Sequence, residues 1–174
     1  MTYRASEDVE RFCVDAHPKL VAALTHQFGE QWLAEDLAQE ALIRACDRWA
    51  VVRELDSPVG WTFRVGVNLG RSHFRRRAAE RRACARQGRA ADAAVHRDPD
   101  VADRLGLQEA LAALTWRQRQ VVVLRFFLGL PAGEVATVLS TTEGAVRALT
   151  HRAIAVLRAS LDEPFVAEEV PDVS

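Results

Sequence analysis

The apolar residues at the start of the chain follow helical periodicity. Between residues 6 and 28 they recur every three or four positions, at Val9, Phe12, Cys13, Ala16, Leu20 and Leu24. This spacing predicts a helix that Ser6 caps and Gly29 ends. Pro18 has no amide hydrogen to donate within that helix, so we expect a break or kink near His17.

A second predicted helix, from about Trp32 to Trp49, has two unlike faces. Its narrow apolar face consists of alanines and a tryptophan, at Ala34, Ala38, Ala41, Ala45 and Trp49. The opposite side carries Asp36, Glu40 and Ile43. An isoleucine ringed by acids suits a docking surface for a basic protein partner. An incidental exposed apolar residue is an equally open interpretation.

Residues 59–89 carry the longest pattern in the chain. Apolar residues alternate with others at its start, as in a strand, but no proline occurs between Pro58 and Pro99 and the run is far too long for a strand. At about 100° per residue, a helix gives it an apolar face and a polar face. The apolar face holds Val59, Phe63, Val67 and Phe74, and the polar face holds Arg64, Asn68, Arg71 and Arg75.

Charge is segregated along the chain, although its formal net charge is only −1. Residues 64–89 contain nine Arg and one acid, whereas residues 7–56 contain eleven acids and five bases. Arginine binds phosphate through paired hydrogen bonds, and Trp61 beside the polar face offers a stacking surface for a base. The pattern therefore favours nucleic-acid binding, with a solvated basic face as the alternative.

The second half is typical of a helix-turn-helix domain. Leu107, Leu111 and Leu114 mark one helix, and Thr115 can cap the next, expected over 116–128. A short helix over 131–139, a turn at 140–142 and a longer helix over 143–161 follow. Arg147, Ala148, His151 and Arg152 are predicted to face outward toward a DNA groove, while Val146, Thr150, Ala153, Ile154 and Leu157 face the core. A helical hairpin without a DNA role has the same shape.

The whole pattern predicts an all-α protein of two small helical domains joined by a linker. We expect a first domain over residues 1–86, a linker over 87–104, a helix-turn-helix domain over 105–161 and an acidic tail over 162–174. The three cysteines are widely spaced and form no Cys/His cluster, so we expect no metal site and no cofactor. No apolar run approaches the length of a membrane span, so we expect a cytoplasmic protein without membrane insertion. No nucleophile–base arrangement indicates an enzyme.

Three stretches of the chain resemble the sigma-70 family of RNA polymerase initiation factors, and more narrowly its extracytoplasmic-function (ECF) group. They are Ala34-Glu-Asp-Leu-Ala-Gln-Glu40, Trp61-Thr-Phe-Arg-Val-Gly-Val-Asn-Leu69 with its arginine tail, and the segment from Leu111 to Leu157. They occur in the family's order and cover most of the chain.

The resemblance implies a function in promoter-specific transcription initiation. Core RNA polymerase would be bound by Asp36, Gln39, Glu40 and Ile43. The −10 element would be held and opened by Trp61, Arg64, Asn68, Arg71, Arg75 and Arg76, together with the 53–58 loop. The −35 element would be read by Arg147, His151 and Arg152. An anti-sigma factor is a further partner that the family implies.

Two departures from the family pattern affect these expectations. Ala148, Leu149 and Thr150 stand where a polar-basic pair followed by Leu is usual, and we expect Leu149 to be exposed. Ser72-His73 stands where an acid is common. Two other functions remain open at this point: a stand-alone helix-turn-helix regulator that binds DNA without polymerase, and an interaction protein that occupies polymerase without starting transcription.

Overall fold

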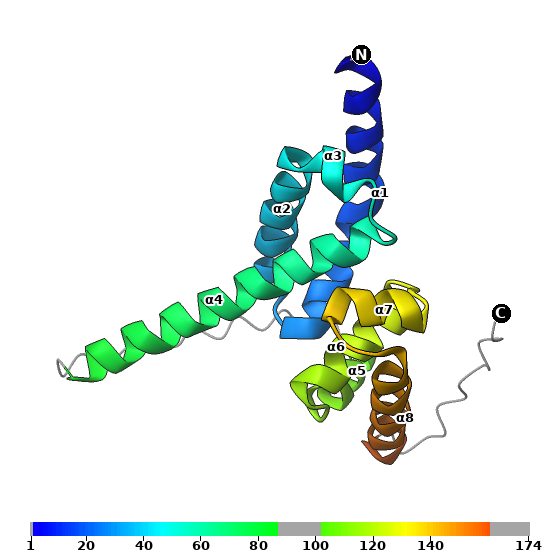
Figure 1. Cartoon of the computed structure of the whole chain (residues 1–174). Helices are drawn as coiled ribbons and strands as arrows, with labels where there is room; N and C mark the ends of the chain where they lie inside the picture. Colours follow the sequence, from blue (N-terminus) through cyan, green and yellow to red (C-terminus); the bar gives the residue numbers. More distant parts are fainter. Residues whose placement is uncertain (1, 87–101, 161–174) are drawn as a thin grey trace.

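The computed structural model describes residues 2–86 and 102–160, which form helices joined by short turns (Figure 1). The N-terminal half holds α1 (Thr2–Phe28), α2 (Gln31–Asp47), α3 (Trp49–Val52) and α4 (Pro58–Arg86). The C-terminal half holds α5 (Ala102–Ala112), α6 (Trp116–Val122), the π-helix η1 (Val123–Phe127), α7 (Ala132–Leu139) and α8 (Glu143–Ser160). The predicted all-α class is confirmed.

The first helix runs without interruption through Pro18, so the predicted break is wrong. Pro18 is exposed and the preceding turn is too, with Val14 73% exposed, so water can satisfy the carbonyl that loses its helical partner. The helix begins at Thr2, which places the expected cap Ser6 inside it. Gly29 ends it as predicted, with a φ of 81° and an amide that donates to the Thr25 carbonyl at 2.7 Å.

Helix α2 packs against α1 through the predicted alanine face, all of whose alanines are buried. It ends at Asp47, because Arg48 leaves the helical conformation with φ −117° and ψ 20°. Trp49 therefore begins the short α3 instead of ending α2, and its ring lies 4.9 Å from that of Phe12 on α1. This contact fixes the corner from which the chain turns toward α4.

Helix α4 crosses α1 and α2 near its start, and its second part projects away from the other helices (Figure 1). Phe63 and Val67 are fully buried on the predicted apolar face. A Cβ at Gly66 would lie 2.9 Å from Leu24 of α1, so the glycine permits a close approach of the two helices. The close packing holds the first turns of α4 rigidly, which in turn fixes the direction of its polar face.

The C-terminal half follows the predicted helix-turn-helix order with one irregular turn. Thr115 and Gln118 form a capping box at the start of α6. The expected single helix over 116–128 is wrong, because the chain changes from α to π geometry at Val123 and the amide of Leu128 donates to the carbonyl of Val123 at 3.1 Å. Gly129, with a φ of 69°, then ends the segment.

One large apolar cluster spans both halves of the chain. Its buried residues include Leu20 and Leu24 of α1 and Phe63 of α4, and also Val135 of α7 and Val146 of α8. The two helical domains thus pack directly on each other. The predicted domain boundary and most of the predicted linker lie at residues 87–101, outside the described residues, and positions 102–104 of that linker belong to α5.

Candidate nucleic-acid and polymerase interfaces

The start of α4 is fixed by a local cap. Ser57 Oγ accepts a 3.2 Å hydrogen bond from the Gly60 amide, and Pro58 occupies the first helical position. Ser57 is buried, so this turn is anchored in the protein and not free in solvent. The cap sets where α4 begins and therefore which residues of the helix face outward.

The predicted polar face of α4 is exposed along its length. Arg64, Asn68, Arg71 and Arg75 are all exposed, and Trp61 is half-buried near the start of the same helix. Arg76 is exposed too. It is one residue beyond Arg75 on the helix and so points about 100° away from this polar face. The structure brings together the first five of these side chains and leaves Arg76 to one side.

One side chain of the polar face, that of Arg75, is held by a neighbour on the same helix. Arg75 Nη2 donates to Ser72 Oγ at 3.0 Å, and that hydroxyl donates to the Asn68 carbonyl at 3.0 Å. Ser72, which departs from the family pattern, thus orients Arg75 along the helix. Its neighbour His73 is half-buried, with its ring edge toward Trp32 of α2 at 6.3 Å between centroids.

Arg64 differs from the other arginines of the polar face of α4 because it contacts the C-terminal half of the chain. Its Nη1 donates to the Val138 carbonyl at 2.8 Å and to Ser140 Oγ at 3.1 Å. Both acceptors lie at the end of α7, where Ser140 adopts a left-handed conformation with φ 52°. The carbonyl that ends α7 carries partial negative charge, which suits a guanidinium partner.

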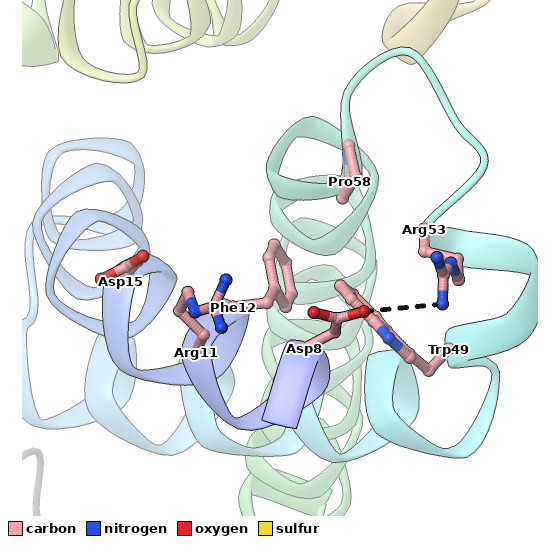
Figure 2. Close-up of a pocket in the computed structure, with 7 residues that line it drawn as sticks. All are labelled: Asp8, Arg11, Phe12, Asp15, Trp49, Arg53 and Pro58. Atoms are coloured by element: carbon pink, nitrogen blue, oxygen red, sulfur yellow. Dashed lines mark ion pairs between the residues drawn. The ribbon is translucent and has the colours of Figure 1, made fainter. Parts of the chain in front are cut away.

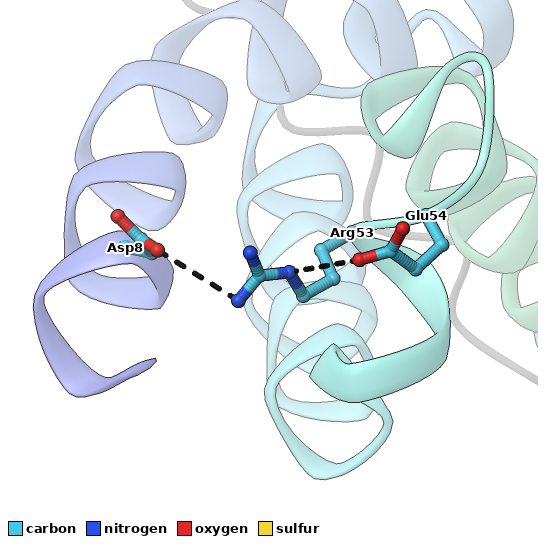
Figure 3. A network of polar contacts seen from close by, with 3 residues as sticks. All are labelled: Asp8, Arg53 and Glu54. Carbon is cyan, nitrogen blue, oxygen red and sulfur yellow. Dashed lines mark hydrogen bonds and ion pairs between the residues drawn. The ribbon is translucent and has the colours of Figure 1, made fainter. Parts of the chain in front are cut away.

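A shallow hollow lies beside the turn that leads into α4 (Figure 2). It is lined by Asp8, Arg11, Phe12, Asp15, Trp49, Arg53 and Pro58. At its rim Arg53 lies between two carboxylates, 3.1 Å from Glu54 and 3.8 Å from Asp8 of α1 (Figure 3). Both pairs are well exposed and so contribute little to stability, and only the pair with Asp8 links this turn to α1.

The outer face of α2 is acidic with an apolar centre. Asp36, Gln39 and Glu40 are exposed, and Ile43 among them is 49% exposed. Glu40 also accepts a 3.0 Å hydrogen bond from Arg44 Nε one turn later. The face lies opposite the buried alanines, so the packing of α2 on α1 and α4 leaves it open to a partner.

The second helix of the helix-turn-helix pair begins at a threonine cap. Thr142 Oγ1 accepts a hydrogen bond from the Ala145 amide at 3.2 Å. Arg147, Ala148, His151 and Arg152 are exposed on α8, and Arg147 pairs with Glu143 at 2.6 Å. Val146 and Ala153 are fully buried on the other side.

The expectation that Leu149 of this helix is exposed is wrong. The side chain is half-buried and packs against the main core cluster, so it is not the exposed leucine that we expected. The position is therefore part of the packing of α8 on the core.

The sequence patterns did not identify the residues that join the two halves. His26 of α1 stacks on Phe127 of η1 with 3.9 Å between ring centroids, and its Nδ1 lies 3.2 Å from Gln108 Nε2 of α5. Burial lowers the pKa of His26 and also that of Arg119. Arg119 Nη1 donates to the Gln27 carbonyl of α1 at 3.1 Å, and its Nε donates to Leu111 at 2.8 Å. No local periodicity signals contacts between residues so far apart in the chain.

Two features are absent from the part of the chain that the structure describes: a cluster of metal ligands and a membrane-spanning helix. The side chains there form no group of three or more His, Cys, Asp or Glu residues suited to a metal ion. Among the described helices, none is both long and apolar enough to cross a bilayer.

Two family models match the chain in the order of its two halves. The model of sigma-70 region 2 matches residues 13–80, and that of sigma-70 region 4 matches residues 104–157. The chain belongs to the sigma-70 family. It is thus an RNA polymerase sigma factor, and sigma factors are a family of transcription regulators. The region 2 match accounts for the first half, which a stand-alone helix-turn-helix regulator does not explain.

Individual relatives place the chain in the ECF group of that family. The RNA polymerase sigma-E factor of Streptomyces avermitilis is 33% identical over 130 residues, which are 74% of this chain and 71% of that protein. The ECF RNA polymerase sigma factor SigL of Mycobacterium tuberculosis is 31% identical over 140 residues, 78% of each chain.

The fold is also similar to that of a solved sigma factor. The sigma factor RpoE of Bartonella quintana, crystallised in complex with the anti-sigma factor NepR, matches with a TM-score of 0.73 and 22% identity. The match covers 90% of this chain and 99% of that one. At this identity the likeness concerns the fold alone.

Proposed function

We propose that this ECF sigma factor directs core RNA polymerase to promoters in the cytoplasm through three separate surfaces. The observation that carries the proposal is the α4 face, where exposed Arg71, Arg75 and Asn68 lie on the same side of a helix whose start is fixed by Ser57. We assign residues 1–86 to binding of polymerase and the −10 element, and residues 105–161 to the −35 element.

The α4 face is suited to single-stranded DNA. Arginines can hold phosphates, Asn68 can hydrogen-bond a base edge, and half-buried Trp61 can stack on a base. Such contacts favour an unstacked strand over a duplex, and stacking alone contributes about 1–3 kcal/mol per base. We assign to Trp61, Arg64, Asn68, Arg71 and Arg75 the capture of the opened −10 strand, with Arg76 in a phosphate contact at its edge.

The outer face of α2 is the proposed polymerase surface. Exposed carboxylates at Asp36 and Glu40 offer charge to a basic partner, and Ile43 offers an apolar contact at the centre. Gln39 adds a hydrogen-bonding side chain at the rim. An apolar centre with a polar rim is the usual composition of a protein interface.

Helix α8 is the proposed reader of the −35 duplex. Arg147, His151 and Arg152 project from its exposed side, and arginine pairs with guanine edges or phosphates. Because Arg147 is paired with Glu143, that ion pair must open for Arg147 to contact DNA. We also propose an anti-sigma factor as a partner, by analogy with the complex of the Bartonella protein.

Transcription in vitro tests this assignment directly. Core polymerase with the wild-type chain is expected to produce specific transcripts from a genomic promoter library, and core polymerase alone is not. Replacing Asp36→Arg and Glu40→Arg together should abolish pull-down of core polymerase. The matched control, Asp15→Arg with Glu109→Arg, also reverses two exposed acids but leaves the proposed face intact. Equal pull-down by both pairs of variants would contradict the polymerase surface.

A further inference from the structure

Two cysteine sulfurs lie side by side where α1 packs on α2. Cys13 Sγ of α1 is 3.4 Å from Cys46 Sγ of α2, within hydrogen-bond distance for sulfur, and both thiols are free. Because a disulfide bond is about 2.0 Å long, the sulfurs need to approach by only about 1.4 Å to become bonded.

Contacts on both sides of this pair hold the two helices together. Ala16 follows the α1 cysteine by one turn and Ala45 directly precedes the α2 cysteine, and both alanines are buried. Next to them, the ring of Phe12 lies 4.9 Å from that of Trp49. The closeness of the sulfurs therefore follows from the packing of the helices.

The two thiols differ in their access to solvent. Cys46 is exposed, whereas Cys13 is half-buried and packs against the main core cluster. Burial, together with a hydrogen bond and charge interaction with Cys46, raises the pKa of Cys13 to about 11. A reagent in solution therefore meets Cys46 first, and Cys13 reacts best with a group that is already beside it.

Metal binding does not account for the pair. Among the described residues, no group of three or more His, Cys, Asp or Glu side chains is suited to a metal ion. Two thiolates alone supply half of the usual ligands of a structural zinc ion. Two adjacent thiols without further ligands are suited instead to oxidation.

We infer that Cys13 and Cys46 form a site of reversible oxidation by hydroperoxides, in which Cys46 is oxidised first and Cys13 resolves it. The Cys46 thiolate attacks one oxygen of hydrogen peroxide, the O–O bond breaks, and Cys46 becomes a sulfenic acid while the other oxygen leaves as water. The Cys13 thiolate then attacks the Cys46 sulfur, the S–O bond breaks, and the second oxygen leaves as water. Two thiols and one peroxide thus give one disulfide and two waters, and the two thiol protons end in the waters.

The position of Cys13 gives this reaction a consequence for Cys46. A sulfenic acid that meets a second peroxide becomes a sulfinic acid, which thiols do not reduce. Capture by Cys13 prevents that step. It also ties the end of α2, one turn beyond Ile43, to α1. The inference does not depend on the proposed function.

Peroxide treatment of the folded wild-type chain tests the inference. After a pulse of hydrogen peroxide, the remaining thiols are alkylated in guanidinium chloride and the peptides are analysed by mass spectrometry. We expect Cys13 and Cys46 to be joined, Cys84 to be joined to neither, and dithiothreitol to restore both thiols. In the chain unfolded before treatment, the Cys13–Cys46 fraction should be lower by about threefold or more, because three cysteines allow three pairings.

Single substitutions test the two roles separately. In Cys13→Ser the sulfenic acid has no resolving thiol, so sulfinic acid at Cys46 should rise several-fold above its wild-type level. In Cys46→Ser, Cys13 should be oxidised more slowly than Cys46 is in Cys13→Ser, because Cys13 is still half-buried. Cys84→Ser is the matched control and should form the Cys13–Cys46 disulfide like the wild type. Circular dichroism verifies that each variant stays helical.

Two results would overturn the inference. One is a folded wild-type chain whose Cys13 and Cys46 stay unlinked at a peroxide dose that oxidises free glutathione, or whose disulfides involve Cys84 instead. The other is equal sulfinic acid at Cys46 in the wild type and in Cys13→Ser, which would remove the resolving role of Cys13. The first result needs no variant, so it stands even if a substituted chain does not fold.

Discussion

Arg64 Nη1 of α4 lies 2.8 Å from the carbonyl oxygen of Val138 at the end of α7. The two residues are 74 positions apart, so the bond joins the halves of the sigma factor. Arg64 thus contacts the C-terminal half in this structure and is also a proposed DNA contact. The other exposed arginines of the stripe have no contact of this kind among the described hydrogen bonds.

Arg64 and Arg71 should therefore respond differently to the same substitution. Arg64→Ala removes the bonds across the interface and a proposed DNA contact, so solution scattering should show a larger radius of gyration and transcription should change. Arg71→Ala should lower promoter-specific transcription by roughly tenfold, because a charged hydrogen bond contributes about 1.5 kcal/mol or more. Its radius of gyration should equal that of the wild type. A larger radius for Arg71→Ala would contradict this division of roles.

Gly70 should be among the least replaceable residues of α4. A Cβ there would overlap the ring of Phe28, which is packed between Phe74 and Trp116 with centroid distances of 5.7 and 5.5 Å. Gly70→Ala should lower the free energy of unfolding by about 1–3 kcal/mol, since the ring has little room to move. Urea denaturation followed by circular dichroism measures the change.

Gly106 offers a matched control for that experiment. It lies in α5 with nothing within 4 Å of its added Cβ, so Gly106→Ala should raise the free energy of unfolding by about 0.5–1 kcal/mol. If both substitutions had the same sign, close packing at Gly70 would not be the cause.

The interface should weaken in mild acid because of His26. Burial lowers the pKa of His26, so the packed form favours the neutral ring. The stabilisation by His26 is complete above its ordinary pKa of about 6.5 and is lost as the pH falls through the lowered value. Between pH 7.5 and 5.0, the free energy of unfolding should fall more for the wild type than for His26→Gln. His151→Gln, at an exposed histidine, should behave like the wild type.

Cys13 should be a slowly reacting thiol. Burial, with added effects of a hydrogen bond and charge interaction with Cys46, raises the pKa of Cys13 to about 11. Its sulfur lies 3.4 Å from that of Cys46 on α2. Because the thiolate is the reactive form, alkylation of Cys13 by iodoacetamide should stay slow at pH 8. Cys46→Ala should speed it, as followed by peptide mass spectrometry, and an unchanged rate would contradict the influence of Cys46.

Much of the local structure could be predicted from the sequence because it depends on neighbouring residues. Gly29 ends α1, Thr115 caps α6, and the apolar face of α4 is buried as its periodicity predicts. Each of these signals involves residues within a few turns of one another. The same applies to the polar stripe on α4, whose exposure follows from the burial of the opposite face.

Other features depend on distant contacts and could not be predicted in this way. The π turn at Val123–Phe127 lies in a segment whose apolar residues serve both halves of the protein, and its local sequence is equally compatible with an α-helix. Leu149 is half-buried because the core reaches under α8. Pro18 is tolerated because its turn faces solvent, which depends on how α1 packs. Contacts such as that of Arg119 with Gln27 leave no periodic pattern.

The central claim is that the α4 face holds the opened −10 strand, and permanganate probing of unpaired thymines tests it most directly. On a promoter selected by the wild-type holoenzyme, thymines near −10 should be reactive with the wild-type chain and with Arg77→Ala, whose arginine lies on the other side of α4. They should be unreactive with the Asn68→Ala, Arg71→Ala double variant, although that variant still binds core polymerase. Undiminished thymine reactivity with the double variant would contradict the account.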